Sequence, residues 1–129
     1  RVLPGCEARI VDPQTGRELP DGQSGEFCAR GHGLMLGYYR QPEMTAQAID
    51  AEGWLHTGDL AMREPNGYFR ITGRLKDLVI RGGENIFPRE IEEVLYEHPA
   101  VRDVQVIGVP DRKFGEQVMA WVCLRDGRE

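Results

Sequence analysis

The chain has 129 residues, of which 16 are Gly and 8 are Pro, and hydrophobic residues make up 40% and charged residues 29%. These proportions indicate a turn-rich globular chain with a core of single-domain size, and they exclude a collagen, a coiled coil and a membrane-spanning protein. The formal net charge is -5 without a long run of either sign, which argues against nucleic acid and anionic lipid as partners. A phosphate-bearing small molecule is still an acceptable ligand, since a few basic side chains suffice to bind it.

The first half of the chain is predicted to form short strands separated by turns. Residues 7–11 alternate polar and apolar side chains, and a second strand is predicted near residues 26–30. Residues 42–49 begin with Pro and predict a short helix whose apolar face carries Met44, Ala48 and Ile49. Residues 60–63 and 68–72 flank a Pro-Asn-Gly turn, which is the clearest hairpin signal in the chain.

The pattern of short strands separated by turns ends near Gly73, so residues 73–77 are the expected domain boundary. An apolar run at residues 78–80 precedes two glycines, and residues 88–97 predict a helix that begins with Pro and ends before the next Pro. Residues 101–109 and 117–124 predict strands. The second is apolar on both faces, which is typical of a strand buried on both sides.

The cysteines and histidines do not have the spacing of a disulfide framework or of a metal site. The odd number of cysteines, their wide separation and the lack of a CxxC pair indicate reduced thiols in a cytoplasmic protein. No bound metal is expected. The residues concerned are Cys6, Cys28, Cys123, His32, His56 and His98.

Two polar residues that follow glycines are candidates for nucleotide binding. Asp59 follows Gly58, where a carboxylate can accept two hydrogen bonds from a sugar diol; the alternative is a cap on a turn. Arg74 follows Gly73 and can bind phosphate or ribose oxygens; the alternative is a surface ion pair. On spacing alone, the structural alternative is favoured at both positions.

Four segments that occur in order along the chain together resemble the AMP-forming acyl-CoA synthetases of the adenylate-forming superfamily. They are residues 25–49 (GEFCARGHGLMLGYYRQPEMTAQAI), 53–61 (GWLHTGDLA), 67–101 (GYFRITGRLKDLVIRGGENIFPREIEEVLYEHPAV) and 106–122 (VIGVPDRKFGEQVMAWV). The resemblance reverses the preference at Asp59 and Arg74 in favour of nucleotide binding.

The resemblance implies an α+β fold with two parts. Residues 1–75 would be the β-rich subdomain, a distorted barrel, that ends the large N-terminal domain. Residues 76–129 would be the first part of the small mobile C-terminal domain, with a short antiparallel sheet and a helix.

The resemblance also implies roles for single residues. Asp59 matches the aspartate that holds the ribose hydroxyls of ATP or AMP, and Arg74 matches an arginine that contacts the same nucleotide. Lys76 matches the hinge about which the small domain rotates, where an exposed cation tolerates the dihedral change.

A further set of residues is implied to bind CoA. Gly82, Gly83 and Glu84 belong to a loop that matches the one lining the pantetheine tunnel, where glycines allow close approach. Phe114 matches an aromatic that some relatives place against the CoA nucleotide, and a packing role is equally open. No catalytic residue is implied within the chain, and Lys113 does not match the adenylation lysine.

The implied reaction is a two-step ligation that uses ATP, Mg²⁺ and CoA. A carboxylic acid, expected to be a fatty or other hydrophobic acid, forms an acyl-adenylate, and the CoA thiol then displaces AMP. In relatives the phosphate loop, the adenine-binding strand and the acyl pocket precede residue 1, and the adenylation lysine follows residue 129. We therefore expect the 129-residue chain alone to form no acyl-adenylate.

Two other functions stay open from the sequence. An adenylate-forming relative could pass its acyl group to a carrier protein instead of CoA. A non-catalytic β-rich module could assemble through its apolar surfaces by dimerisation or exchange of segments.

Overall fold

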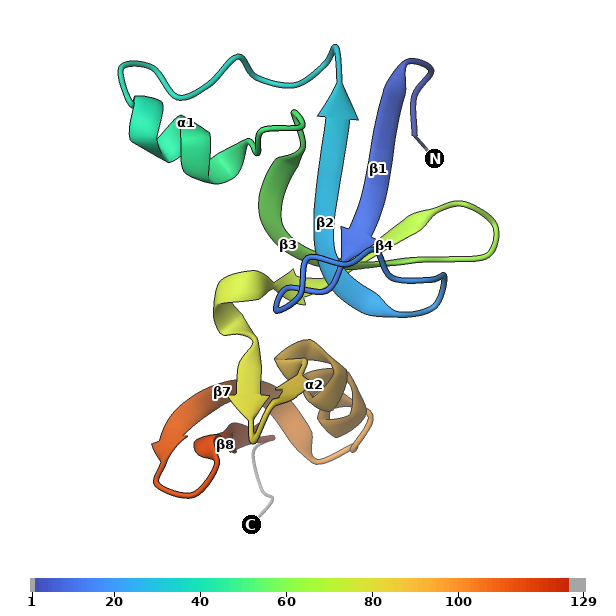
Figure 1. Ribbon diagram of the computed structural model, residues 1–129. Helices are drawn as coiled ribbons and strands as arrows, with labels where there is room; N and C mark the ends of the chain where they lie inside the picture. Colours follow the sequence, from blue (N-terminus) through green and yellow to red (C-terminus); the bar gives the residue numbers. More distant parts are fainter. Residues whose placement is uncertain (1, 126–129) are drawn as a thin grey trace. The chain divides into compact units, whose positions relative to one another are not determined.

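The computed structural model describes residues 2–125 and divides into two compact units, Arg1–Leu75 and Lys76–Glu129. In the described residues, each unit contains one four-stranded antiparallel sheet and one α-helix (Figure 1). This mixed, strand-rich architecture confirms the α+β class. The assignment of the two units to a large and a small domain stays a prediction.

The first unit is built on the sheet β1-β2-β3-β4, whose strands follow one another in chain order. The strands are β1 (Cys6–Val11), β2 (Ser24–Gly31), β3 (Leu55–Arg63) and β4 (Phe69–Arg74). A short turn at residues 64–68 connects β3 to β4, and the longer segment of residues 12–23 connects β1 to β2. Both connections join antiparallel neighbours. The buried apolar side chains come from three of the strands and from the loop before β3, and they include two adjacent pairs: Ile10, Val11, Cys28, Trp54, Leu60 and Ala61.

The predicted hairpin at residues 60–72 is confirmed as β3 and β4. Gly67 has a φ of +78°, in the left-handed region that glycine tolerates, and its N–H donates to the carbonyl of Glu64 at 2.8 Å. The Tyr68 N–H is held by the side-chain oxygen of Asn66 at 3.0 Å. The turn therefore fixes the register in which β4 returns along β3.

The first helix, α1 (Pro42–Ala48), is confirmed but lies on the surface. It begins with Pro42 in its first turn and has no fully buried residue. Ala48 and Ile49 are half-buried, whereas Met44 is exposed, so the predicted apolar face is only partly covered. A hydrogen bond instead joins the helix to the preceding loop, because the Tyr38 N–H donates to the Thr45 hydroxyl.

The second unit has the sheet order β6-β5-β8-β7. Val101, Val104 and Val106 form its core, and Ile91 and Leu95 of the helix pack against them. The elements are η1 (Leu75–Asp77), β5 (Val79–Arg81), β6 (Glu84–Ile86), α2 (Pro88–Tyr96), β7 (Val101–Asp111) and β8 (Gly115–Leu124). The predicted helix and the two long strands are confirmed, while the three-residue strand β6 is an addition.

The expectation that the last strand is buried on both sides is wrong for the described residues. Trp121 is 64% exposed and Val122 is 47% exposed. In residues 76–125, β8 pairs with β7 along its length but with β5 at the Arg81–Gly115 position alone. Among the described residues, the second half of β8 is therefore hydrogen-bonded to β7 alone. Its apolar side chains have the composition of a central strand but are largely exposed. Neither helix in the described residues has the length and apolar character needed to cross a membrane.

Candidate functional site

Asp59 lies in an irregular stretch of β3. In the pairing of β2 with β3, Glu26 is opposite Leu60 whereas Cys28 is opposite His56, so residues 57–59 of β3 stand against Phe27 alone. Gly58, in the middle of this bulge, has a φ of +70°. A bulge of this kind redirects the side chains next to it, and the left-handed conformation explains the glycine. For convenience we refer to residues 57–59 as the β3 bulge.

Side chains supply the hydrogen bonds that the regular ladder cannot make at the β3 bulge. The Thr57 hydroxyl donates to the carbonyl of Phe27 at 2.7 Å and accepts the N–H of Asp59 at 3.1 Å. The Gly58 N–H donates to Oε1 of Glu26 at 3.3 Å. The N–H groups of Gly58 and Asp59 are thus both bonded to side chains, as part-buried polar groups require.

The structure brings Asp59 and Arg74 together. The two residues are opposite each other in the β3–β4 pairing, and Nη1 of Arg74 lies 2.8 Å from Oδ1 of Asp59. The Arg74 side chain is 62% exposed and that of Asp59 is 31% exposed. Such an exposed pair contributes little to stability, so the oxygens of a ligand can compete for both groups at low cost. A carboxylate that accepts from a diol and a guanidinium that donates to phosphate or ribose are suited to a nucleotide.

Gly82 and Phe114 are neighbours in the second unit. The Gly82 N–H donates to the carbonyl of Phe114 at 2.8 Å, and a Cβ at Gly82 would lie 3.3 Å from Cδ1 of the ring. Gly82 and Gly83 have φ values of +60° and +90° and form the turn between β5 and β6. Glu84 begins β6 and is exposed. Four residues with a predicted CoA-binding role therefore lie around one hairpin.

Arg81 is part of the same hairpin and was not anticipated as a site residue. Its guanidinium carbon lies 4.1 Å from the centre of the Phe114 ring, and Nζ of Lys113 lies 4.9 Å from it. Hydrogen bonds from the backbone N–H groups of Phe114 and Lys113, and then the charge of Arg81, lower the pKa of Asp111. The sequence shows only a basic residue directly before two glycines. The pairing of Arg81 on β5 with Gly115 on β8 brings its guanidinium to the Phe114 ring.

Lys76, the predicted hinge, lies in the short turn η1 and is the first residue of the second unit. Its side chain is exposed. This placement agrees with the prediction that the residue is free of core packing, and its role in rotation stays a prediction.

Comparison with known proteins places these features in a family. The sequence pattern of the AMP-binding enzymes matches residues 1–39, and that of the AMP-binding enzyme C-terminal domain matches residues 90–129, together more than half of the chain. The chain belongs to the AMP-binding enzyme family. It is 59% identical over 128 residues to the putative acyl-CoA synthetase YngI of Bacillus subtilis, covering 99% of this chain and 23% of that protein.

Other members of the AMP-binding family are similar over the same length. The human mitochondrial medium-chain acyl-CoA ligase ACSF2 is 44% identical over all 129 residues, which are 21% of its own length. The crystal structure of ATP-bound MatB from Rhodopseudomonas palustris superposes with a TM-score of 0.88 at 45% identity, covering 98% of this chain and 25% of that one. The amide bond synthetase McbA from Marinactinospora thermotolerans gives a TM-score of 0.85 at 43% identity, with 98% and 25% covered. The chain spans about a quarter of the length of these relatives.

A cluster of polar side chains around His56 could not be found from the sequence alone. Nδ1 of His56 lies 2.8 Å from Oε2 of Glu26 and 3.5 Å from Sγ of Cys28, and Nε2 lies 3.6 Å from Oδ2 of Asp50. Glu26 and Cys28 point the same way because they are two residues apart on β2, and strand pairing places His56 opposite Cys28. The sequence does place residues 26 and 28 on one face of a strand. It does not show which strand pairs with β2, and so it does not place His56 beside them.

The cluster around His56 offers ligand atoms to a metal, and its members are also hydrogen-bonded to one another. One ligand atom each from Glu26, Cys28 and His56 lies within 4.8 Å of the others. Burial, and then the negative charge of Glu26, raises the pKa of the Cys28 thiol to about 11. Without a metal, the neutral thiol is therefore the favoured form of Cys28 at neutral pH.

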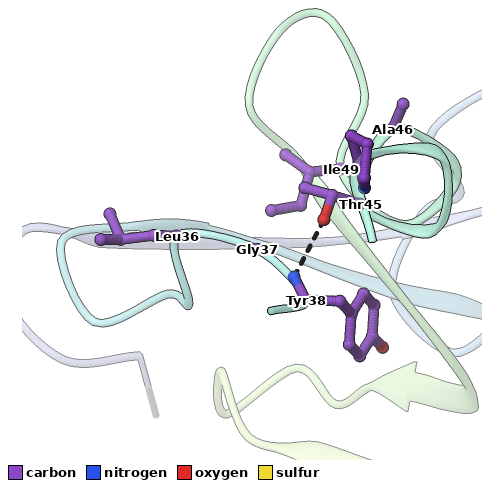
Figure 2. A pocket seen from close by; sticks show the side chains of 7 residues that line it. Leu36, Gly37, Tyr38, Thr45, Ala46 and Ile49 are labelled. Atoms are coloured by element: carbon purple, nitrogen blue, oxygen red, sulfur yellow. Dashed lines mark hydrogen bonds between the residues drawn. The ribbon is translucent and has the colours of Figure 1, made fainter. Parts of the chain in front are cut away.

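A groove beside α1 is lined by apolar and small side chains (Figure 2): Leu36, Gly37, Tyr38, Pro42, Thr45, Ala46 and Ile49. The Tyr38 N–H donates to the Thr45 hydroxyl at 2.9 Å, the bond drawn in Figure 2. A Cβ at Gly37 would lie 2.7 Å from Cγ2 of Thr45, so glycine is required for this close approach. None of the predicted site residues is among those lining the groove.

Proposed function

We propose that the chain is part of an AMP-forming acid–CoA ligase. The observation that carries this proposal is the Asp59–Arg74 pair at the β3 bulge, 2.8 Å apart, in a chain matched over its whole length by CoA ligases. The ATP-bound state of the MatB neighbour supports ATP and AMP as its nucleotides. Mg²⁺ and CoA belong to the proposed reaction of the whole protein.

In the proposed reaction a carboxylate oxygen of the acid attacks the α-phosphorus of ATP. The bond to pyrophosphate breaks and acyl-AMP forms; the CoA sulfur then attacks the acyl carbon, and AMP leaves with the bonding electrons. The part played by this chain is to bind and orient the nucleotide. Asp59 would accept hydrogen bonds from the ribose hydroxyls, and Arg74 would donate to nucleotide oxygens. No bond-making step is assigned to a residue of the chain.

The chain would also serve the second step. Lys76 would act as the hinge of a domain rotation, and Gly82, Gly83 and Glu84 would line the path of the pantetheine arm. Phe114, already stacked with Arg81, would lie against the CoA nucleotide. The support for this assignment is the positive φ of both glycines and the exposed, cationic surroundings of the ring.

We propose a fatty or other hydrophobic acid as the substrate, because the ACSF2 relatives are named medium-chain acyl-CoA ligases. A relative named sulfoacetate–CoA ligase, from Cupriavidus necator, is 47% identical over 122 residues. A substrate panel for the protein that contains this chain should therefore hold both medium-chain acids and sulfoacetate. Preference for sulfoacetate would overturn this part of the proposal.

A chimera tests the nucleotide-binding role directly. The chain would replace the aligned segment of human ACSF2, and medium-chain acyl-CoA, AMP and pyrophosphate would be measured. Loss of one hydrogen bond to a charged group costs about 1.5–3 kcal/mol, so we expect Asp59→Ala to raise the KM for ATP by at least roughly 10- to 100-fold. Asp21→Ala is the matched control, because Asp21 is also a carboxylate of the first unit that pairs with an arginine, Arg63.

Two results would refute the nucleotide-binding role. One is a folded chimera that forms no acyl-adenylate, and the other is an equal effect of Asp59→Ala and Asp21→Ala. The isolated 129-residue chain is expected to bind AMP feebly and to catalyse no acid-dependent ATP–pyrophosphate exchange. Exchange by the purified chain would show that more of the active site is present than we propose.

The acceptor of the acyl group needs its own assay, since the similar structure of McbA is named an amide bond synthetase. We propose CoA, and the competing acceptors are a carrier-protein thiol and an amine. The protein that contains this chain would be supplied with all three in parallel. Exclusive use of the carrier protein or of the amine would contradict our choice.

A further inference from the structure

We propose that the buried carboxylate of Glu26 positions Asp59 and thereby sets the affinity of the protein for the ribose of ATP. This inference rests on the proposed nucleotide-binding role of Asp59. Glu26 itself does not touch the nucleotide in this scheme; it acts through the backbone of the β3 bulge.

Glu26 is an unusual residue for its place. It is 7% exposed, on the inner face of β2, where a carboxylate is costly to bury unless its oxygens are hydrogen-bonded. Both oxygens are engaged: Oε1 accepts the Gly58 N–H at 3.3 Å, and Oε2 lies 2.8 Å from Nδ1 of His56. The carboxylate therefore contacts β3 at two points: at His56, directly before the bulge, and at Gly58, within it.

The contacts of Glu26 with β3 matter because Gly58 is the residue directly before Asp59. With no side chain and a φ of +70°, Gly58 has a wide choice of conformations, and a Cβ there would meet nothing within 4 Å. Glu26 holds the N–H on one side of this flexible residue, and Thr57 holds the N–H on the other side at Asp59. Loss of either bond would let the Asp59 carboxylate drift, and binding groups need to be placed to within about 0.5 Å.

His56 is itself fixed by a second carboxylate. Its Nε2 lies 3.6 Å from Oδ2 of Asp50, and that residue accepts the backbone N–H groups of Glu52 and Trp54 at 2.9 Å each. These bonds, that of Trp54 first, lower the pKa of Asp50 and keep it ionised. The imidazole thus lies between two carboxylates, and its Nδ1 is in hydrogen-bond contact with Oε2 of Glu26.

The test compares Glu26→Gln with the unmodified chimera of ACSF2. The amide is uncharged and has one acceptor oxygen and one N–H₂ group, so it cannot accept hydrogen bonds from both the Gly58 N–H and a protonated Nδ1 of His56. We expect the KM for ATP to rise about tenfold, while kcat and the KM for the acid change less than twofold. Glu7→Gln is the matched control: Glu7 is a carboxylate of the neighbouring strand β1, exposed and paired with Arg30, and we expect less than a twofold change.

A double-mutant cycle distinguishes positioning from a general loss of structure. If Glu26 acts through Asp59, Glu26→Gln changes the KM for ATP less than twofold once Asp59→Ala is present. Thermal unfolding of each variant would be measured in parallel. If Glu26→Gln fails to fold, Glu26→Asp keeps the charge with a shorter reach, and we expect an intermediate rise in the KM for ATP of about threefold.

Three outcomes would overturn the inference. A folded Glu26→Gln chimera with an unchanged KM for ATP, while Asp59→Ala still raises it, would refute the positioning role and leave the proposed function intact. Equal effects of Glu26→Gln with and without Asp59 would show that the two residues act independently. Stoichiometric binding of Zn²⁺ to the chain, lost in both Glu26→Gln and Cys28→Ser, would assign the cluster to a metal instead.

Discussion

Raising the pH should destabilise the first unit through the Cys28 thiol. The Cys28 side chain is fully buried, at 0% exposure, against Val11 and Trp54, and burial, followed by the charge of Glu26, raises its pKa from 9.0 to about 11. A group whose pKa is higher in the folded state contributes its full stabilisation below the pKa of the unfolded chain. That contribution is lost as the pH rises from about 9 to about 11, and the difference corresponds to about 3 kcal/mol.

The assay is denaturant unfolding of the 129-residue chain at pH 8 and at pH 11. The Cys28→Ala variant loses packing at both pH values, but its free energy of unfolding should fall less between them, by up to about 3 kcal/mol, because no thiol remains to ionise. Cys123→Ala is the control, since Cys123 is exposed and its removal should leave the pH dependence unchanged. An equal loss of stability on alkalinisation in the wild-type chain and in Cys28→Ala would refute the reasoning.

Three further predictions concern packing, the bulge and the hinge. Leu60→Ala should lower the free energy of unfolding by about 2–5 kcal/mol in a chemical denaturation experiment, because this leucine is 1% exposed; a loss below 1 kcal/mol would contradict its place in the core. Gly58→Ala and Gly16→Ala, with φ values of +70° and +68° and open space around both, should each cost about 1–2 kcal/mol, but only the first should weaken ATP binding in the chimera. Lys76→Pro should slow thioester formation more than adenylation when the half-reactions are timed separately, and equal losses would contradict the hinge role.

The secondary structure could be predicted where local chemistry decides it. Pro42 and Pro88 each lie in the first turn of a helix, and Gly67 closes the hairpin with a positive φ. These signals act within a few residues, so the sequence alone carries them. The strand β6 was missed because three residues after a glycine pair carry no periodicity, and pairing with β5 is what makes them a strand.

The two residues proposed to bind the nucleotide could be predicted from the sequence, but the residues that hold them in place could not. Asp59 and Arg74 were found from the family resemblance, and the structure adds that they pair with each other. Glu26 and His56 were not found, because their proximity depends on the register of β2 against β3. A shift by one residue would turn Glu26 away from the bulge, and nothing within residues 24–31 specifies that register.

Strands β3 and β4, which carry the proposed nucleotide-binding pair, both depart from regular pairing next to Asp59 and Arg74. Side chains of β2 bond to the residues at both irregularities. In β4 the pairing passes from Gly73 opposite Leu60 to Ile71 opposite Ala61, which leaves Thr72 as an extra residue just before the Gly73–Arg74 step. Thr72 is 5% exposed, and its hydroxyl lies 2.7 Å from that of Ser24 on β2.

The bulge before Asp59 is held in the same way by Glu26, two residues further along β2. In a regular ladder the directions of paired side chains are set by the strand. The two bulges change these directions, and Oδ1 of Asp59 lies 2.8 Å from Nη1 of Arg74. The buried Glu26 and the half-buried Ser24 of β2 are thus explained by the shape of the neighbouring strands, since a bulge leaves polar groups that an apolar strand could not satisfy.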